Sequence, residues 1–195
     1  RAFANIDARA YCAIEPDRRS GMRQYNFELF GNLPEEIFTD AELKTLEEAT
    51  GVYTQRIANM PPAIEKRELE RLIVELSWKS SRIEGNTYTL LDTEKLILEN
   101  REAAGHGHAE AQMILNHKDA FLFVREYASR FRRVSRAYIE QVHAILVKGL
   151  SVGTGLREKP VGVLGSVYRP LDTVHQLREG MDALGAAVSR VKTPY

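Results

Sequence analysis

The chain has 195 residues, enough for one substantial core or for a small domain and a large part of another. Lys and Arg total 27, as do Asp and Glu, so no net basic field favours nucleic acid or an anionic membrane as a partner. The single cysteine, Cys12, excludes an internal disulfide; with no bilayer-length apolar run and no signal-peptide pattern, it favours a cytoplasmic protein.

The hydrophobic pattern predicts a mainly α-helical fold, and its first clear helix begins at Thr39. Thr39 and Glu42 have the spacing of a capping box. Pro61-Pro62 ends this helix and opens a second, because proline is tolerated in the first turn of a helix. The second helix is expected to bury one apolar stripe, made of Leu69, Leu72, Ile73, Leu76 and Ile83.

Glu84 and Gly85 follow directly at the end of that second helix. Gly85 suits the left-handed conformation that commonly ends a helix. A carboxylate at this position faces the negative end of the helix dipole, which is unfavourable by roughly 0.3–1 kcal/mol unless a cation meets it. The sequence therefore leaves two interpretations of Glu84: a residue that serves a cationic partner, or a solvated carboxylate beside a capping glycine.

Four further helices are expected. The first starts after Thr89, which can cap it together with Asp92, and ends near Asn100, before a loop at 103–108. The others begin beyond that loop, after Ser135 and after Thr173. Their inward faces are expected to carry Met113, Ile114, His117, Phe121 and Val124; Ile139, Val142, His143 and Leu146; and Val174, Leu177, Met181, Leu184 and Val188.

The segment "KPVGVLGSVYRP" (159–170) changes from helical to strand-like composition. Gly165-Ser166 is a good two-residue hairpin turn, and the prolines at both ends confine the segment to a short edge ribbon. Such a ribbon is unstable alone and must pack on helices. Its free edge can accept an extended peptide as an added strand, so a docking element and a purely structural ribbon are both possible interpretations.

Several segments of the chain resemble the Fic family. "SSRIEGN" (80–86) is similar to the inhibitory-helix motif Ser/Thr-x-x-x-Glu-Gly/Asn, with Ser80, Glu84 and Gly85 at the motif positions. The flanking segments 32–51 and 86–97 resemble the region around that helix. "YIEQVHAILVKGL" (138–150) resembles the first helix of the Fic domain, and 155–172 its flap hairpin after a Gly-x-Arg segment.

The resemblance implies a mainly α-helical Fic-type bundle with one short β-hairpin. Residues 1–104 would be a helical N-terminal region containing the inhibitory helix at about 62–85. Residues 105–195 would be the leading part of the Fic domain, with the flap at about 157–169. The sequence starts without methionine and stops at Tyr195, so we expect a fragment of a longer protein.

The resemblance also implies an activity. Fic enzymes typically transfer AMP from ATP, with Mg²⁺, to a Ser, Thr or Tyr hydroxyl of a target protein. Their signature His-x-Phe-x-Asp/Glu-Gly-Asn-x-x-x-x-Arg is absent from this sequence, so no catalytic residue and no ATP or Mg²⁺ ligand is assigned to it. The expected partners are ATP and an acceptor protein, which can be the enzyme itself; a homo-oligomer is compatible with this, and neither a membrane nor nucleic acid is indicated.

By this resemblance, Glu84 would pair with the last arginine of the signature and hold ATP in a non-productive pose. Ser80, one turn earlier, would help hold the helix and its carboxylate in place; the alternative is a small surface residue. Target docking through the flap would use backbone hydrogen bonds. The flap residues are Val161, Gly162, Val163, Leu164, Gly165, Ser166, Val167 and Tyr168.

Two other functions remain open from the sequence: a non-catalytic, antitoxin-like protein that presents its inhibitory helix to another chain, and a helical interaction module that binds no nucleotide. His106 and His108 could bind a metal, but two ligands without a third favour an ordinary loop. Trp78, just before the motif, is better explained by packing than by adenine stacking.

Overall fold

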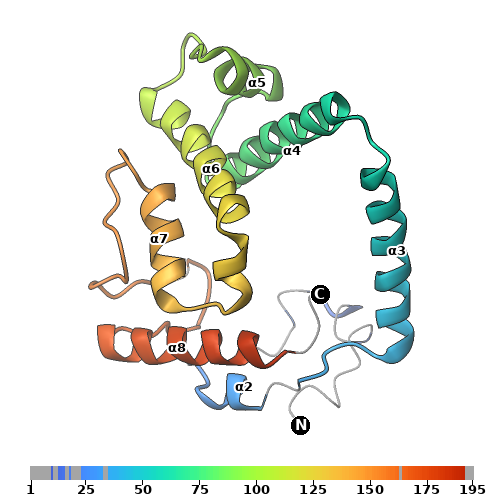
Figure 1. Ribbon diagram of the computed structural model, residues 1–195. Helices are drawn as coiled ribbons and strands as arrows, with labels where there is room; N and C mark the ends of the chain where they lie inside the picture. Colours follow the sequence, from blue (N-terminus) through green and yellow to red (C-terminus); the bar gives the residue numbers. More distant parts are fainter. Residues whose placement is uncertain are drawn as a thin grey trace. The chain divides into compact units, whose positions relative to one another are not determined.

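The computed structural model describes residues 10, 13–15, 18, 23–32, 35–162 and 164–191, so Cys12 and Val163 lie outside it. Within these residues the chain is mainly α-helical, as the sequence predicts, and no β-strand is formed (Figure 1). The elements are α2 (Glu28–Gly31), α3 (Asp40–Ala58), α4 (Pro62–Ile83), α5 (Leu90–Glu99), α6 (His108–Glu126), the 3-10 helix η2 (Ala128–Arg132), α7 (Arg136–Leu146) and α8 (Val174–Arg190).

The helix start and stop signals read from the sequence are confirmed. The Thr39 hydroxyl accepts from the Glu42 N–H at 3.4 Å, and the Glu42 carboxylate accepts from the Thr39 N–H at 2.8 Å. α4 begins at Pro62. Thr89 caps α5 through the Asp92 N–H at 3.1 Å, and Thr173 caps α8 in the same way through Gln176. Local capping chemistry therefore sets the helix boundaries here.

The chain divides into two compact units. One comprises 1–37, 133–136 and 156–195, and the other comprises 38–132 and 137–155. The motif helix α4 belongs to the second unit and the expected flap to the first. The division expected at 104/105 rests on the family resemblance and stays a prediction.

The larger unit is built around α4, α5 and α6, and α4 packs against both of the other two helices. Its core cluster consists of Tyr88, Leu96, Ala111 and Ile114, all of them buried. α6 is also tied to the segment after α7, because the buried Asn116 amide donates to the carbonyls of Leu146 and Lys148 at 2.9 and 2.8 Å. The core cluster joins α5 and α6 to the segment that follows α4, while α4 itself packs directly on α6.

The smaller unit pairs α2 with α8. The Arg190 guanidinium at the end of α8 donates to the Phe30 carbonyl at 2.6 Å, and Arg136 pairs with Asp182 at 3.3 Å. α8 buries Gly180, Gly185 and Ala187. The expectation that Val188 faces inward is wrong, since its side chain is exposed; the small residues are what this helix buries.

The apolar stripe expected on α4 is only partly correct. Ile73 is buried, but Leu72, Leu76 and Ile83 are exposed, Ile83 to 87%. The buried face instead carries Ile73, Val74, Ser77 and Ser81. Periodicity locates an apolar stripe but not the side from which neighbouring helices approach, and small residues allow a closer approach than leucines.

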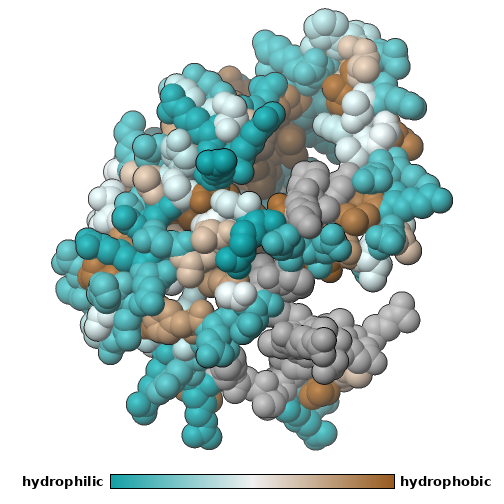
Figure 2. Space-filling view, turned by 60° about the horizontal axis from the view of Figure 1, so that its bottom comes forward, coloured by the Kyte–Doolittle hydropathy of each residue, from teal (hydrophilic) through white to brown (hydrophobic). Residues whose placement is uncertain are grey.

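The hydrophobic residues on the surface are spread out among hydrophilic ones. Figure 2 shows hydrophobic residues in separate places on a visible face that is mostly hydrophilic. No helix among the described residues combines the length and the hydrophobicity needed to cross a membrane.

The hairpin expected at 157–169 is not confirmed. A turn lies at 164–165, with Gly165 at φ +74°, but the described residues around it form no strand pair. The bridge in this region joins Arg169 to Gln24 in parallel, and the Arg169 N–H donates to the Arg23 carbonyl at 2.8 Å. Short edge ribbons gain little from pairing alone, which fits a segment with a turn and one bridge.

Candidate functional site

The end of α4 is a well-formed Schellman turn around Gly85. The Gly85 N–H donates to the Arg82 carbonyl at 3.1 Å, and the Asn86 N–H donates to the Ser81 carbonyl at 3.0 Å. Gly85 has φ +92°, which glycine adopts without steric strain. Glu84 is the C-cap residue of the helix. The Glu84 N–H itself donates to the Ser81 carbonyl at 3.1 Å, so the backbone of Glu84 is held by its own bond and by those of the two residues that follow.

The Glu84 side chain is exposed, and no cation of the described residues lies within ion-pair distance of its carboxylate. Its charge acts on His117 of α6, a half-buried imidazole. Burial lowers the pKa of His117, and the Glu84 carboxylate partly opposes this by raising it. The unfavourable charge at the helix end noted in the sequence is thus left uncompensated within the described chain.

Ser80 is half-buried one turn before Glu84. Its neighbours Ser77 and Ser81 are the fully buried serines of α4, and neither hydroxyl has a hydrogen-bond partner among the described residues. Each such hydroxyl costs about 1–3 kcal/mol of desolvation. The role expected for Ser80 in holding Glu84 stays a prediction.

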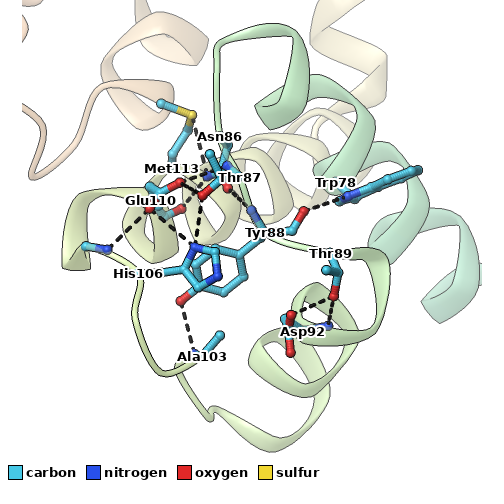
Figure 3. A network of polar contacts seen from close by, with 11 residues as sticks. Trp78, Asn86, Thr87, Tyr88, Thr89, Asp92, Ala103, His106, Glu110 and Met113 are labelled. Atoms are coloured by element: carbon cyan, nitrogen blue, oxygen red, sulfur yellow. Dashed lines mark hydrogen bonds and ion pairs between the residues drawn. The ribbon is translucent and has the colours of Figure 1, made fainter.

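The segment just after the motif is clamped to the start of α6 (Figure 3). The buried Asn86 amide donates to the Glu110 backbone carbonyl at 2.8 Å, and its oxygen accepts from the Tyr88 N–H at 3.0 Å. The Thr87 N–H and hydroxyl both donate to the Glu110 carboxylate, at 2.8 and 2.7 Å. We call Asn86, Thr87 and Glu110 the post-motif clamp.

Glu110 uses both carboxylate oxygens in these contacts. The second oxygen accepts from the Gly107 N–H at 3.2 Å and lies 3.4 Å from the His106 imidazole. The Thr87 hydroxyl and N–H bonds, with smaller contributions from Gly107 and His106, lower the pKa of the Glu110 carboxyl to about 2. Glu110 is therefore a charged acceptor at neutral pH.

The histidines and aromatics near the motif serve this local structure. His106 contacts the Thr87 hydroxyl at 3.0 Å and packs on the Tyr88 ring with 4.5 Å between centroids, while His108 lies 3.0 Å from Glu102. Trp78 donates from its indole N–H to the Tyr88 carbonyl at 3.0 Å, which supports packing over adenine stacking. The described residues contain no group of three or more His, Cys, Asp or Glu that could hold a metal ion.

The expected flap lies in the other compact unit, so its placement relative to Glu84 is not defined. Tyr168 is half-buried, and its N–H donates to the Ser166 hydroxyl at 3.1 Å. The rest of the described flap is exposed, most fully at Leu164. The exposed members are Val161, Gly162, Leu164, Gly165, Ser166 and Val167.

Sequence reasoning missed the clamp, and above all Glu110. The three-residue spacing of Gly107 and Glu110 at the start of α6 was an available signal, since a glutamate at this position commonly reaches back to the helix start. Its second role, holding Thr87 from 23 residues away, has no local signature. No protein-family model, no curated protein and no solved structure matches this chain.

Proposed function

We propose that this chain is the regulatory and leading catalytic-domain portion of a self-inhibited Fic-type protein AMP-transferase, with Glu84 as its inhibitory carboxylate. The observation that carries the proposal is Glu84 itself: an exposed carboxylate held by a hydrogen-bonded turn at the end of α4, without an ion-pair partner in the described chain. A guanidinium is the cation that pairs most strongly with such a carboxylate, through two parallel hydrogen bonds.

Two further observations support the proposal. Ile83 and Leu76 are exposed apolar side chains on the same helix, and a second protein surface at the end of α4 would bury them. The turn at 164–165 is exposed, so its backbone is open to an acceptor protein, as the proposal requires. ATP and Mg²⁺ would be the cosubstrates, and their ligands are not assigned to this chain.

The test is AMP transfer by the full-length gene product that contains this chain. With α-labelled ATP, Glu84→Gly should increase the label on protein by at least about tenfold, because a charge-assisted hydrogen bond contributes roughly 1.5–3 kcal/mol and 1.4 kcal/mol is a factor of ten. Glu84→Gln should act in the same direction with less effect, since it keeps the shape but loses the charge.

Glu126→Gly is the matched control. Glu126 is likewise an exposed glutamate at the end of a helix, the last residue of α6, so its substitution carries the same glycine penalty without touching the motif. Transfer by this variant should equal that of the unmodified protein. Equal transfer by all variants, or none by any, would remove the proposed brake.

The antitoxin-like alternative is favoured by the same exposed residues of α4, which would equally suit another chain. Dilution separates the two functions. A brake acting within one molecule gives a specific activity that is independent of protein concentration, whereas a brake supplied by a second chain weakens on dilution. In the antitoxin-like case the gene product itself transfers no AMP, and it should inhibit a separate AMP-transferase when added to it, with this inhibition lost in Glu84→Gly.

A further inference from the structure

We propose that Glu110 is a positioning residue for Glu84, which it holds in place through the post-motif clamp. This inference rests on the proposed function for its consequence in catalysis, but not for its geometry. The clamp lies at Asn86 and Thr87, only two and three residues beyond Glu84 (Figure 3). Any movement of the segment at 85–87 therefore moves Glu84.

Asn86 is bonded on two sides. Its N–H returns to α4 at the Ser81 carbonyl, 3.0 Å away, and its side chain reaches α6 at the Glu110 carbonyl, 2.8 Å away. The side chain is also 3.9 Å from the Met113 sulfur. The end of α4 and the first turn of α6 are thus joined directly through one buried residue.

The Glu110 carboxylate adds the charged part of the clamp. It accepts two bonds from Thr87 on one oxygen and one from Gly107 on the other. Hydrogen bonds to an ionised acceptor are roughly twice as strong as neutral ones. The bond from the Gly107 N–H also holds the Glu110 carboxylate against the start of its own helix, so the acceptor of the two Thr87 bonds has a fixed position.

The spacing along α6 shows why this clamp bears on Glu84. Glu110 and His117 are seven residues apart, which is two helical turns, and Met113 lies between them on the same face. Asn86 and Thr87 meet the first part of this face, and the charge of Glu84 reaches His117 further along it. His117 is consequently a built-in reporter of where the Glu84 carboxylate lies.

The first experiment uses the 195-residue chain and follows the His117 pKa by NMR. Glu84→Gln should lower this pKa, because the carboxylate that raises it is removed. Glu110→Ala should shift it in the same direction, and it should add nothing in the Glu84→Gln background. Thr87→Val removes the hydroxyl with its contacts to Glu110 and His106 but keeps the N–H bond to Glu110. It should give a smaller shift, and it serves if Glu110→Ala fails to fold.

Glu102→Ala is the matched control, since it removes a carboxylate–histidine contact with His108 in the same region without contacting the clamp. It should leave the His117 pKa unchanged. A His117 pKa that stays at its original value in both Glu110→Ala and Thr87→Val, while Glu84→Gln lowers it, would overturn the positioning role.

The second experiment separates this inference from the proposed function. In the full-length protein, Glu110→Ala should raise AMP transfer by severalfold, less than Glu84→Gly does, and should give no further rise when combined with it. If Glu110→Ala shifts the His117 pKa but neither Glu110→Ala nor Glu84→Gly changes AMP transfer, then Glu110 positions Glu84 and the proposed inhibitory role of Glu84 is wrong. If Glu84→Gly activates but Glu110→Ala affects neither readout, the brake stands and the positioning role fails.

Discussion

The Thr87 hydroxyl donates a hydrogen bond of 2.7 Å to the Glu110 carboxylate across 23 residues of sequence. With the Thr87 N–H bond of 2.8 Å to the same oxygen, it joins the segment after α4 to the first turn of α6. Because a protonated carboxyl is a weaker acceptor, these two bonds stabilise the ionised form of Glu110 in the folded protein.

Stability should therefore depend on pH through Glu110. Its carboxyl pKa falls from an ordinary value of 4.5 to about 2 on folding. The unfolded chain binds the proton first as pH falls, so the stabilisation is fully present above about pH 4.5 and is lost between there and about pH 2. Urea unfolding at several pH values should show this loss for the unmodified chain and a smaller one for Glu110→Gln.

The difference between the two proteins carries the test. The free energy of unfolding of the unmodified chain minus that of Glu110→Gln should be constant from pH 7 to about pH 5.5. It should shrink steadily toward pH 2, because glutamine cannot titrate. Thr87→Val should give a smaller decline than the unmodified chain, as it keeps the N–H bond but not the hydroxyl bond. A difference that does not vary with pH would contradict the low pKa of Glu110.

The two buried serines of α4 should be dispensable for stability. Ser77 and Ser81 bury hydroxyls without a hydrogen-bond partner in the described chain, and alanine is a better helix former. Ser77→Ala should leave the free energy of unfolding unchanged or raise it by about 0.5–1 kcal/mol. Thermal unfolding of Ser77→Ala and Ser81→Ala measures this, and a clear loss in both would reveal hidden partners for the hydroxyls.

Asn86 provides the contrasting case among buried polar residues of this region. Both ends of its amide are bonded, to the Glu110 carbonyl and the Tyr88 N–H. Asn86→Ala removes both bonds and leaves the N–H of the buried Tyr88 without this acceptor, so it should cost about 1–3 kcal/mol. Equal stabilities for Asn86→Ala and Ser77→Ala would show that the clamp contributes nothing to the fold.

Most of the helical layout could be predicted because its signals are local. Thr39, Thr89 and Thr173 each cap a helix through the third residue that follows, and Pro61-Pro62 separates α3 from α4. These contacts lie within a few residues, so side-chain chemistry alone identifies them. The cap at Gly85 belongs to the same class.

Burial and the clamp could not be predicted in the same way. Leu72 and Leu76 share a stripe with Ile73, yet only Ile73 is buried, because the directions from which α5 and α6 approach α4 are set by the tertiary fold. The Thr87–Glu110 pair lies far apart in sequence. Glu84 was singled out both by its charge at the end of a helix and by the family resemblance, whereas Ser80 was singled out by the resemblance alone.

Gly85 should tolerate only residues that accept a left-handed backbone. Its φ of +92° closes the Schellman turn at the end of α4, and an alanine there should cost about 1–2 kcal/mol. Gly85→Asn should cost less, because asparagine visits this region more readily. Gly153→Ala is the control, since an added Cβ at Gly153 meets nothing within 4 Å and its φ is not positive. Unfolding in urea ranks the three variants.

A second pair of glycines tests the packing of α8. A Cβ added at Gly185 would lie 2.8 Å from the Val134 carbonyl oxygen, a backbone atom that cannot move aside cheaply. Gly185→Ala should therefore destabilise the chain by about 1–3 kcal/mol, despite the better helix propensity of alanine. Gly51 in the exposed middle of α3 has open space around it, so Gly51→Ala should stabilise by about 0.5–1 kcal/mol. Thermal unfolding should show a lower melting temperature for Gly185→Ala and a higher one for Gly51→Ala. The added methyl group overlaps a backbone oxygen at Gly185, whereas at Gly51 it projects into open space.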